Sequence, residues 1–312
     1  MRGLIMKNCT VTFIITTYNR EKYLLQCINS IIMQKWENIE IVIIDDNSSN
    51  DVYYNLFKTF DNNKIKYIKN DINMGPSYSR KLGLEKASGE FIIFCDDDDF
   101  YTDDSFIEFA YQIFSQKESV GIVGFDSYLF NEDTNERRHL REIKEDSIYS
   151  NIVALEHFQR KVPKPKSTFT TIFRKSKLIE SGILDSSMVN DTIIYLYGLT
   201  KSDIFLSSKC IGCYRVHSHN MTKGVNSELI LDTFEEKMKL SKVVERIGID
   251  RRKWLLNQIT LTAEYYWSNT DKRQQNKDID NWILNKLGFN SFFLFLRKNC
   301  INYKRYIKER FL

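Results

Sequence analysis

Short apolar runs alternate with segments of helical periodicity along the first hundred residues. Predicted strands occupy 11–17, 39–46, 64–70 and 90–99, and predicted helices occupy 21–34, 52–60 and 75–87. Strands that are buried on both faces form nearly continuous apolar runs, as these strands do. The pattern therefore predicts an α/β fold, with a mostly parallel, Rossmann-like sheet covered by helices on both faces.

The second part of the chain continues less regularly. A helix is predicted at 105–116, a strand at 120–130 and a charged hairpin or loop at 131–147. Within 162–188 a strand is predicted, followed by a helix that ends at Gly182; a helix at 190–199 and a strand from 204 that runs into a polar loop come after it. From about Ser227 onward every segment has helical periodicity. We predict one α/β domain at 1–225, with halves at about 10–104 and 105–225, and a helical C-terminal region at 226–312.

Composition excludes several classes of protein. The 312 residues are 42% hydrophobic, enough for a large core, and the net charge of +4 gives no basis for nucleic-acid binding. The six scattered cysteines form no disulfide framework, which favours a reducing cytoplasm. Cys210 and Cys213 form a C-x-x-C pair without an adjacent His, so two small residues on a buried strand are favoured over a zinc site. Neither a signal peptide nor a membrane-spanning helix is expected.

Polar and acidic residues follow each of the four predicted strands of the first half. Two of these ends are strongly acidic: Asp45 and Asp46, and the four consecutive aspartates Asp96–Asp99. Ligands of open α/β sheets bind beyond the carboxyl ends of the strands. Adjacent carboxylates repel each other, and Mg²⁺ or Mn²⁺ held jointly with substrate phosphates cancels that repulsion. The sequence has no EF-hand spacing, no P-loop and no G-x-G-x-x-G.

The C-terminus combines aromatic and basic residues. Between 286 and 312 there are seven basic residues and one acidic residue, beside the aromatic run FNSFFLFLRK. This composition is typical of a helix that lies in a membrane interface near anionic lipid. A helix that packs its Phe side chains on the domain is the alternative.

Four stretches together resemble the family 2 glycosyltransferases of the GT-A fold. These are FIITTYNREKYLLQCINSIIMQ, IEIVIIDDNSSND, NMGPSYSRKLGLEKASGEFIIFCDDDDF and YRVHSHNMT, which span about residues 10–222. The order and spacing of the stretches carry the resemblance, since each one alone is weak. It implies a nucleotide-diphosphate sugar that lies across the strand ends.

The resemblance also implies residues that hold the donor. Thr17, Tyr18 and Arg20 would approach the nucleoside, Asp46 or else Asp45 would accept a hydrogen bond from the base, and Arg80 would meet phosphate charge. Near Arg80 the chain departs from the family pattern, with Ser79 in place of Ala and Lys81 in place of Asn.

The D-x-D motif of the family corresponds to the four aspartates. Asp98 is expected to contact Mn²⁺ or Mg²⁺ most directly, Asp96 to reach ribose or metal, and Asp99 to join the metal site, while Asp97 takes the variable position and is expected to point away. Near the C-terminal end of the match, Arg215 and His217 are expected beside the diphosphate or metal, with His217 favoured over His219.

An inverting transfer also needs a general base for the acceptor hydroxyl. The resemblance places it at Asp191, although Asn190 replaces the first acid of the usual pair; Asp185 is the next candidate, and an N-cap role is the alternative for Asp191. The implied function is transfer of one sugar, from a UDP-sugar, to a growing glycan of the bacterial surface or to a lipid-linked glycan. The enzyme is expected at the cytoplasmic face of the membrane. A non-catalytic nucleotide-sugar-binding module and a metal-dependent nucleotide-sugar phosphohydrolase are the alternatives.

Overall fold

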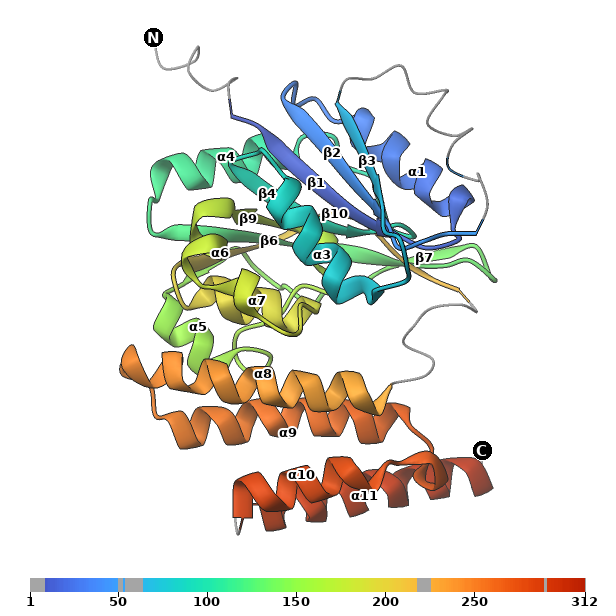
Figure 1. Ribbon diagram of the computed structural model, residues 1–312, viewed down its shortest axis with the longest axis vertical. Coiled ribbons are helices and arrows are strands. Elements are labelled where there is room, and N and C mark those ends of the chain that lie inside the picture. Colours follow the sequence, from blue (N-terminus) through green and yellow to red (C-terminus); the bar gives the residue numbers. More distant parts are fainter. Residues whose placement is uncertain (1–8, 50–52, 54–63, 218–225, 289–290, 312) are drawn as a thin grey trace. The chain divides into compact units, whose positions relative to one another are not determined.

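The computed structural model describes residues 9–49, 53, 64–217, 226–288 and 291–311. The chain divides into two compact units, one up to His217 and one from Ser218 (Figure 1). The predicted boundary between the α/β domain at 1–225 and the helical region at 226–312 stays a prediction. The predicted helix at 52–60 lies, except for Tyr53, outside the described residues.

A single sheet forms the centre of the first unit. Its order is β3-β2-β1-β4-β9-β6-β10-β5, with β7 paired to β6 and β8 paired to β10. The strands are β1 Val11–Thr17, β2 Ile39–Asp45, β3 Ile65–Lys69, β4 Phe91–Asp96, β5 Phe100–Tyr101, β6 Val120–Asn131, β7 Glu136–His139, β8 Ser147–Tyr149, β9 Thr171–Arg174 and β10 Asp203–Val216. Strands β3, β2, β1 and β4 run parallel, as do β6 and β10. The antiparallel β9 joins the two parallel groups.

The helices of this unit cover both faces of the sheet. They are α1 Glu21–Ile32, α3 Gly75–Lys86, α4 Phe106–Gln116, α5 Asn151–His157, α6 Lys175–Glu180 and α7 Asp191–Leu199. Helix α3 packs directly on β1 and β2 (Figure 1). Gly83 permits this approach, because a Cβ there would stand only 2.2 Å from a methyl carbon of Ile14. The predicted α/β class is confirmed.

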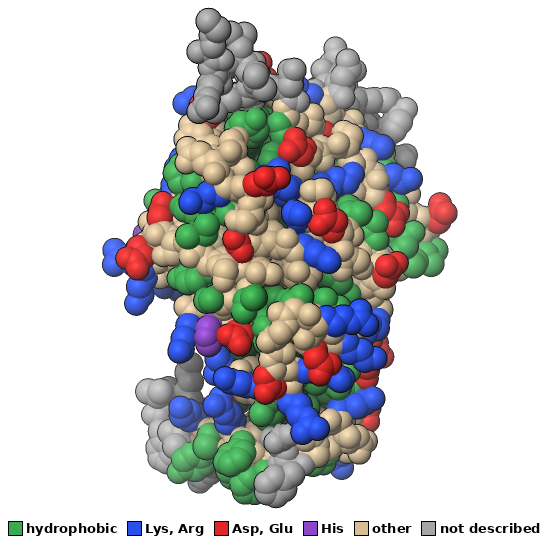
Figure 2. All heavy atoms as spheres, turned by 90° about the vertical axis from the view of Figure 1, so that its left-hand side faces the viewer, with side chains coloured by type: hydrophobic (Ala, Val, Ile, Leu, Met, Phe, Trp, Pro, Cys, Tyr) green, Lys and Arg blue, Asp and Glu red, His purple; other side chains and the backbone are tan. Residues whose placement is uncertain are grey.

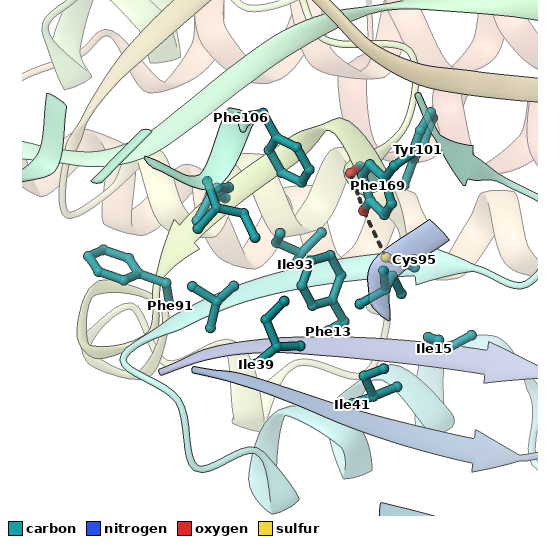
Figure 3. Close-up of a cluster of buried hydrophobic side chains, with 14 of the residues drawn as sticks. Phe13, Ile15, Ile39, Ile41, Phe91, Ile93, Cys95, Tyr101, Phe106 and Phe169 are labelled. Carbon is teal, nitrogen blue, oxygen red and sulfur yellow. Dashed lines mark hydrogen bonds between the residues drawn. The ribbon is translucent and has the colours of Figure 1, made fainter. Parts of the chain in front are cut away.

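The main core lies on the face opposite α3. Side chains alternate between the faces along a strand, and Val11, Phe13 and Ile15 of β1 all point into this core. Figure 3 shows Phe13, Ile93 and Phe106 converging there. The Tyr101 hydroxyl is buried in the same core. It lies 3.1 Å from the Cys95 sulfur and donates to the Phe169 carbonyl at 2.7 Å.

The second unit is helical throughout its described residues, as predicted. Its helices are α8 Ser227–Arg246, α9 Arg251–Asn269, α10 Lys277–Leu287 and α11 Ser291–Phe311, with a short 3₁₀ turn at Lys272–Gln274. Asn226, Asp250 and Asn276 cap the first three helices through their side chains. Within the described parts of the chain, none of the helices is both long and apolar enough to cross a bilayer.

Candidate functional site

The carboxyl ends of three parallel strands meet at one edge of the sheet. Thr17 at the end of β1 lies in register with Asp45 of β2, and Thr16 lies in register with Asp96 of β4. Both acidic strand ends predicted from the sequence are therefore brought to this edge, which is where ligands of open α/β sheets bind.

The first acidic end is Asp45 and Asp46, here called the acid pair. Asp45 accepts hydrogen bonds from the Ser48 amide at 2.8 Å and from the Tyr67 hydroxyl at 2.5 Å. Asp46 accepts from the Asn70 side chain and from the amides of Met74 and Gly75, at 2.7–2.9 Å. Both carboxylates thus hold the loops that leave β2 and enter α3. The expected contact with a nucleotide base stays a prediction.

The second acidic end is Asp96–Asp99, here called the acid cluster. Asp98 accepts from Arg20 at 3.0 Å and lies 2.9 Å from Nε2 of His217. Asp99 accepts from the Arg215 amide through one oxygen, while its other oxygen is buried without a hydrogen-bond partner among the described residues.

Asp97 does not point away as expected. It is 2% exposed and accepts hydrogen bonds from Thr17 at 2.7 Å and Arg20 at 3.2 Å. The turn that follows β4 directs this side chain back toward the end of β1, where the Thr17 hydroxyl and the Arg20 guanidinium donate to it. Asp97 therefore fixes the β1 loop against the acid cluster.

Burial and mutual repulsion make the acid cluster hold protons more tightly than ordinary carboxylates. Burial raises the pKa of Asp97 to about 7, against the opposing effect of Arg20. Burial, together with the charges of Asp98 and Asp96, raises the pKa of Asp99 well above its usual range. Burial also raises the pKa of Asp96, whose neighbour Arg80 acts in the opposite direction.

The acid cluster has the donor chemistry of a hard divalent cation site. It offers carboxylate oxygens, which Mg²⁺ and Mn²⁺ prefer. The unpartnered buried oxygen of Asp99 is a free acceptor beside Asp98 and Asp96. A dication at this place would also offset the burial and the mutual repulsion that raise these pKa values. Asp98, Asp96 and Asp99 are the residues that would hold it.

Arg80 joins the acid cluster to the start of α7. One of its nitrogens lies 2.8 Å from Asp96 and 3.2 Å from Asp191. Asn190, not Asp191, caps the helix, by accepting from the Ile193 amide at 3.0 Å. Asn190, which departs from the family pattern, thus caps the helix. The Asp191 carboxylate is left partly exposed beside Arg80.

Arg215 and His217 enter the site from β10 and the residue that follows it. His217 is 2% exposed and lies directly against Asp98. The Arg215 guanidinium is buried among the rings of Tyr23, Phe100 and Phe130 at 5.0–5.2 Å, and its Nε donates to the Asp98 carbonyl at 2.9 Å. Arg215 therefore holds the backbone of the acid cluster in place through this hydrogen bond. His219 lies outside the described residues.

Two predicted residues remain, Thr17 and Tyr18, and they differ in exposure. Thr17 is buried, and its hydroxyl contacts Tyr53 as well as Asp97. Tyr18 is 47% exposed at the rim of the site. Sequence reasoning missed Tyr53, which also accepts from the Arg20 amide at 2.9 Å, and Glu132, which pairs with Arg215 at 3.3 Å. Neither stands in a motif, and only the folded chain brings them to this edge.

The sequence matches a known family and several characterised proteins. A model described as glycosyl transferase family 2 matches residues 12–181. A GalNAc(5)-diNAcBac-PP-undecaprenol beta-1,3-glucosyltransferase from Campylobacter jejuni is 28% identical over 242 residues, which cover 75% of this chain and 74% of that protein.

Solved structures resemble the fold at low sequence identity. TarS of S. aureus, determined in complex with UDP-GlcNAc, has a TM-score of 0.61 at 14% identity and covers 95% of this chain and 89% of its own. The mannosyltransferase PcManGT of Pyrobaculum calidifontis, determined with GDP-Man and Mn²⁺, has a TM-score of 0.56 at 12% identity and covers 95% and 84%. These likenesses support the predicted GT-A architecture.

Proposed function

The chain belongs to glycosyl transferase family 2 and is a glycosyltransferase, and from this premise we propose that it is an inverting enzyme that transfers a single sugar from a UDP-sugar to a hydroxyl of a growing glycan. The observation that carries the proposal is the position of Arg80 between Asp96 and Asp191. One guanidinium links the carboxylate at the end of β4 to the carboxylate at the start of α7. This arrangement puts the proposed donor site and the proposed base on either side of one side chain.

Asp191 is the proposed general base. An acceptor hydroxyl that attacks the anomeric carbon must lose its proton, and a carboxylate within hydrogen-bond reach accepts it. The side chain of Asp191 is 26% exposed, so a hydroxyl can approach it, while Arg80 holds its orientation. Attack from the face opposite the leaving diphosphate inverts the anomeric configuration.

The donor diphosphate is proposed to lie beside Asp96–Asp99. Arg20, Arg80 and His217 already contact this acid cluster and would offer donors to phosphate oxygens. Tyr18 and the acid pair stand at the same edge, where the nucleoside is proposed to bind. A bound Mg²⁺ or Mn²⁺ would supply charge stabilisation to the nucleotide diphosphate as it leaves. The TarS and PcManGT complexes, with UDP-GlcNAc and with GDP-Man and Mn²⁺, support this choice of ligands.

The acceptor is proposed to be a lipid-linked glycan of bacterial surface polysaccharide. The name of the Campylobacter jejuni relative specifies a glycan on undecaprenyl diphosphate. The growing chain of such an acceptor offers a sugar hydroxyl, while its lipid remains in the membrane. The enzyme would therefore work at the cytoplasmic face of the membrane.

The C-terminal helices are proposed to contact that membrane. Phe292, Phe293 and Leu296 of α11 and Leu284 of α10 are 47–66% exposed. Figure 2 shows hydrophobic side chains gathered at the end of the helical unit, with Lys and Arg side chains on the same face of that unit. Exposed aromatic residues near basic ones suit the interface of an anionic bilayer. We propose 226–312 as this membrane-associating region and 1–225 as the transferase domain.

Turnover assays with three proteins test the proposal. The full chain is mixed with a panel of UDP-sugars, a lipid-diphosphate glycan and Mn²⁺, and UDP release and glycan extension are measured. Asp191→Asn should lower the turnover about 10²–10⁴-fold, as expected for loss of a general base, while UDP binding persists. Asp185→Asn changes an exposed carboxylate on the 3₁₀ turn before α7 and is the matched control, which should keep its activity.

The alternative functions give different results. Donor binding without turnover in any acceptor mixture would identify a binding module. Hydrolysis of the donor to UMP and a sugar 1-phosphate at full rate without acceptor would identify a phosphohydrolase. Equal losses in Asp191→Asn and Asp185→Asn would remove Asp191 from the role of base.

A further inference from the structure

A second group of possible metal ligands lies on β6, β7 and β10, outside the proposed transferase site. Ligand atoms of Asp126, His139 and Cys210 all lie within 4.8 Å of one another. The three side chains come from three neighbouring strands of the sheet. Asp126 lies opposite Cys210 in the register of β6 and β10, and β7 brings His139 alongside β6.

The local backbone fixes the three side chains in this arrangement. Irregular register on either side of Cys210, between Ser207 and Cys210 and between Cys210 and Cys213, sets the direction of its side chain. One oxygen of Asp126 accepts from the Ser127 amide at 2.8 Å, and its other oxygen lies 3.0 Å from Nε2 of His139. The carboxylate is therefore oriented, and its second oxygen faces the imidazole.

We propose that Asp126, His139 and Cys210 bind a zinc ion, with solvent as the fourth ligand. Carboxylate oxygen, imidazole nitrogen and thiolate sulfur together suit Zn²⁺, whereas Mg²⁺ prefers oxygen alone. Ligand atoms of a tetrahedral zinc lie roughly 3.3–3.7 Å apart, so shifts of about 1 Å or less from the present positions close the site. Solvent reaches the site because the His139 side chain is 35% exposed.

Charge also favours a dication at this place. Asp126 is 2% exposed, and among the described residues its ionic contact is with His139. On zinc binding the thiol loses its proton to solvent, and the ion neutralises the thiolate and the carboxylate. The Arg137 guanidinium lies over the Tyr128 ring at 3.5 Å.

The proposed ion would tie together the strands that support the transferase site. Strand β10 continues from Cys210 to Arg215, which braces the acid cluster. Strand β6 leads to Glu132, the ion-pair partner of Arg215. Its role is thus structural, and it is independent of the sugar transfer proposed above.

Cobalt titration tests the zinc site, because a cobalt–thiolate bond gives a near-ultraviolet charge-transfer band. Chelator-stripped full chain should bind one Co²⁺ with this band, and Zn²⁺ should displace it. Cys210→Ser should abolish the band, while Cys9→Ser, which changes another partly buried thiol, should keep it. Asp98→Asn should also keep it, since the acid cluster contains no sulfur.

Two results would overturn the zinc site. One is the absence of a thiolate band in the wild-type protein, and the other is the same band in Cys210→Ser. Should Cys210→Ser fail to fold, His139→Gln changes a partly exposed ring and carries the test. This variant should weaken Co²⁺ binding roughly tenfold or more through the loss of one of three protein ligands, and an unchanged affinity would equally refute the site.

Discussion

The acid pair Asp45–Asp46 and the acid cluster Asp96–Asp99 end β2 and β4, the two strands that flank β1, yet their surroundings differ. Neutral donors surround the acid pair: backbone amides, the Tyr67 hydroxyl and the Asn70 amide. Guanidinium and imidazole groups surround the acid cluster, and one oxygen of Asp99 has no partner among the described residues. The first arrangement satisfies its carboxylates within the chain. The second keeps a carboxylate oxygen that a divalent cation could accept, and such a cation could in turn bind an anionic diphosphate.

Removing one carboxylate from the acid cluster should give the largest effect on activity. Asp98→Asn should lower turnover roughly 1,000-fold, because loss of a metal contact removes several kcal/mol of transition-state stabilisation. Its thermal stability should change little, since the substitution also relieves repulsion within the cluster. Steady-state UDP release, compared with thermal unfolding of the same protein, checks both parts. Turnover within tenfold of the wild type would place the metal elsewhere.

Removing one carboxylate from the acid pair should instead affect folding. Asp46→Ala leaves two partly buried backbone amides and the Asn70 side chain without their acceptor, at a cost of about 3 kcal/mol. For a unit of this size the melting temperature should fall by roughly 6–12 °C. Circular dichroism during heating measures the shift. An unchanged melting temperature, together with lost UDP binding, would give the acid pair the role of a ligand site.

Arg80 sharpens the comparison because it belongs to the acid cluster alone. Arg80→Lys keeps the charge but removes the planar guanidinium, whose one nitrogen contacts Asp96 and Asp191 while another donates to the Val189 carbonyl, so turnover should fall about 10–100-fold. Arg174→Lys is the control, since Arg174 pairs with Glu90 away from the site. The ratio of turnover numbers for the two variants is the measurement, and equal values would contradict a specific role for Arg80.

Lys237 of α8 provides a test of burial without ionic partners, and its effect should be the smallest. It is 1% exposed, donates to the Gln258 carbonyl and the Thr262 hydroxyl, and burial lowers its pKa to about 7. The unfolded chain keeps this proton up to a pH of about 10, so the stability of the helical unit should rise as the pH rises above 7. Below about pH 7 both states carry the proton, and this contribution is constant.

Thermal unfolding between pH 7 and pH 9 measures the contribution of Lys237. The rise in melting temperature should be smaller in Lys237→Met than in the wild type. Lys242→Met, which changes an exposed lysine of the same helix, should retain the wild-type rise. Parallel curves for all three proteins would show that Lys237 does not lose its proton on folding.

Hydrophobic patterning predicted the parallel half of the sheet because β1, β2 and β4 are continuous apolar runs with both faces buried. It did not predict the position of β9, a four-residue strand whose antiparallel pairing with β4 and β6 depends on contacts distant in sequence. Likewise, the spacing of the acids identified both acidic strand ends, but not the difference between the donors that surround each of them. The donors that satisfy Asp46 come from residues 70–75, and only the fold brings them to it.

Calorimetric titration of UDP with and without Mn²⁺ tests most directly whether the acid cluster holds a metal and a diphosphate. Wild type should bind UDP tightly only with Mn²⁺, Asp98→Asn should lose that dependence, and Asp45→Asn, if folded, should retain it. Binding of UDP that is equally Mn²⁺-dependent in wild type and Asp98→Asn would contradict the account.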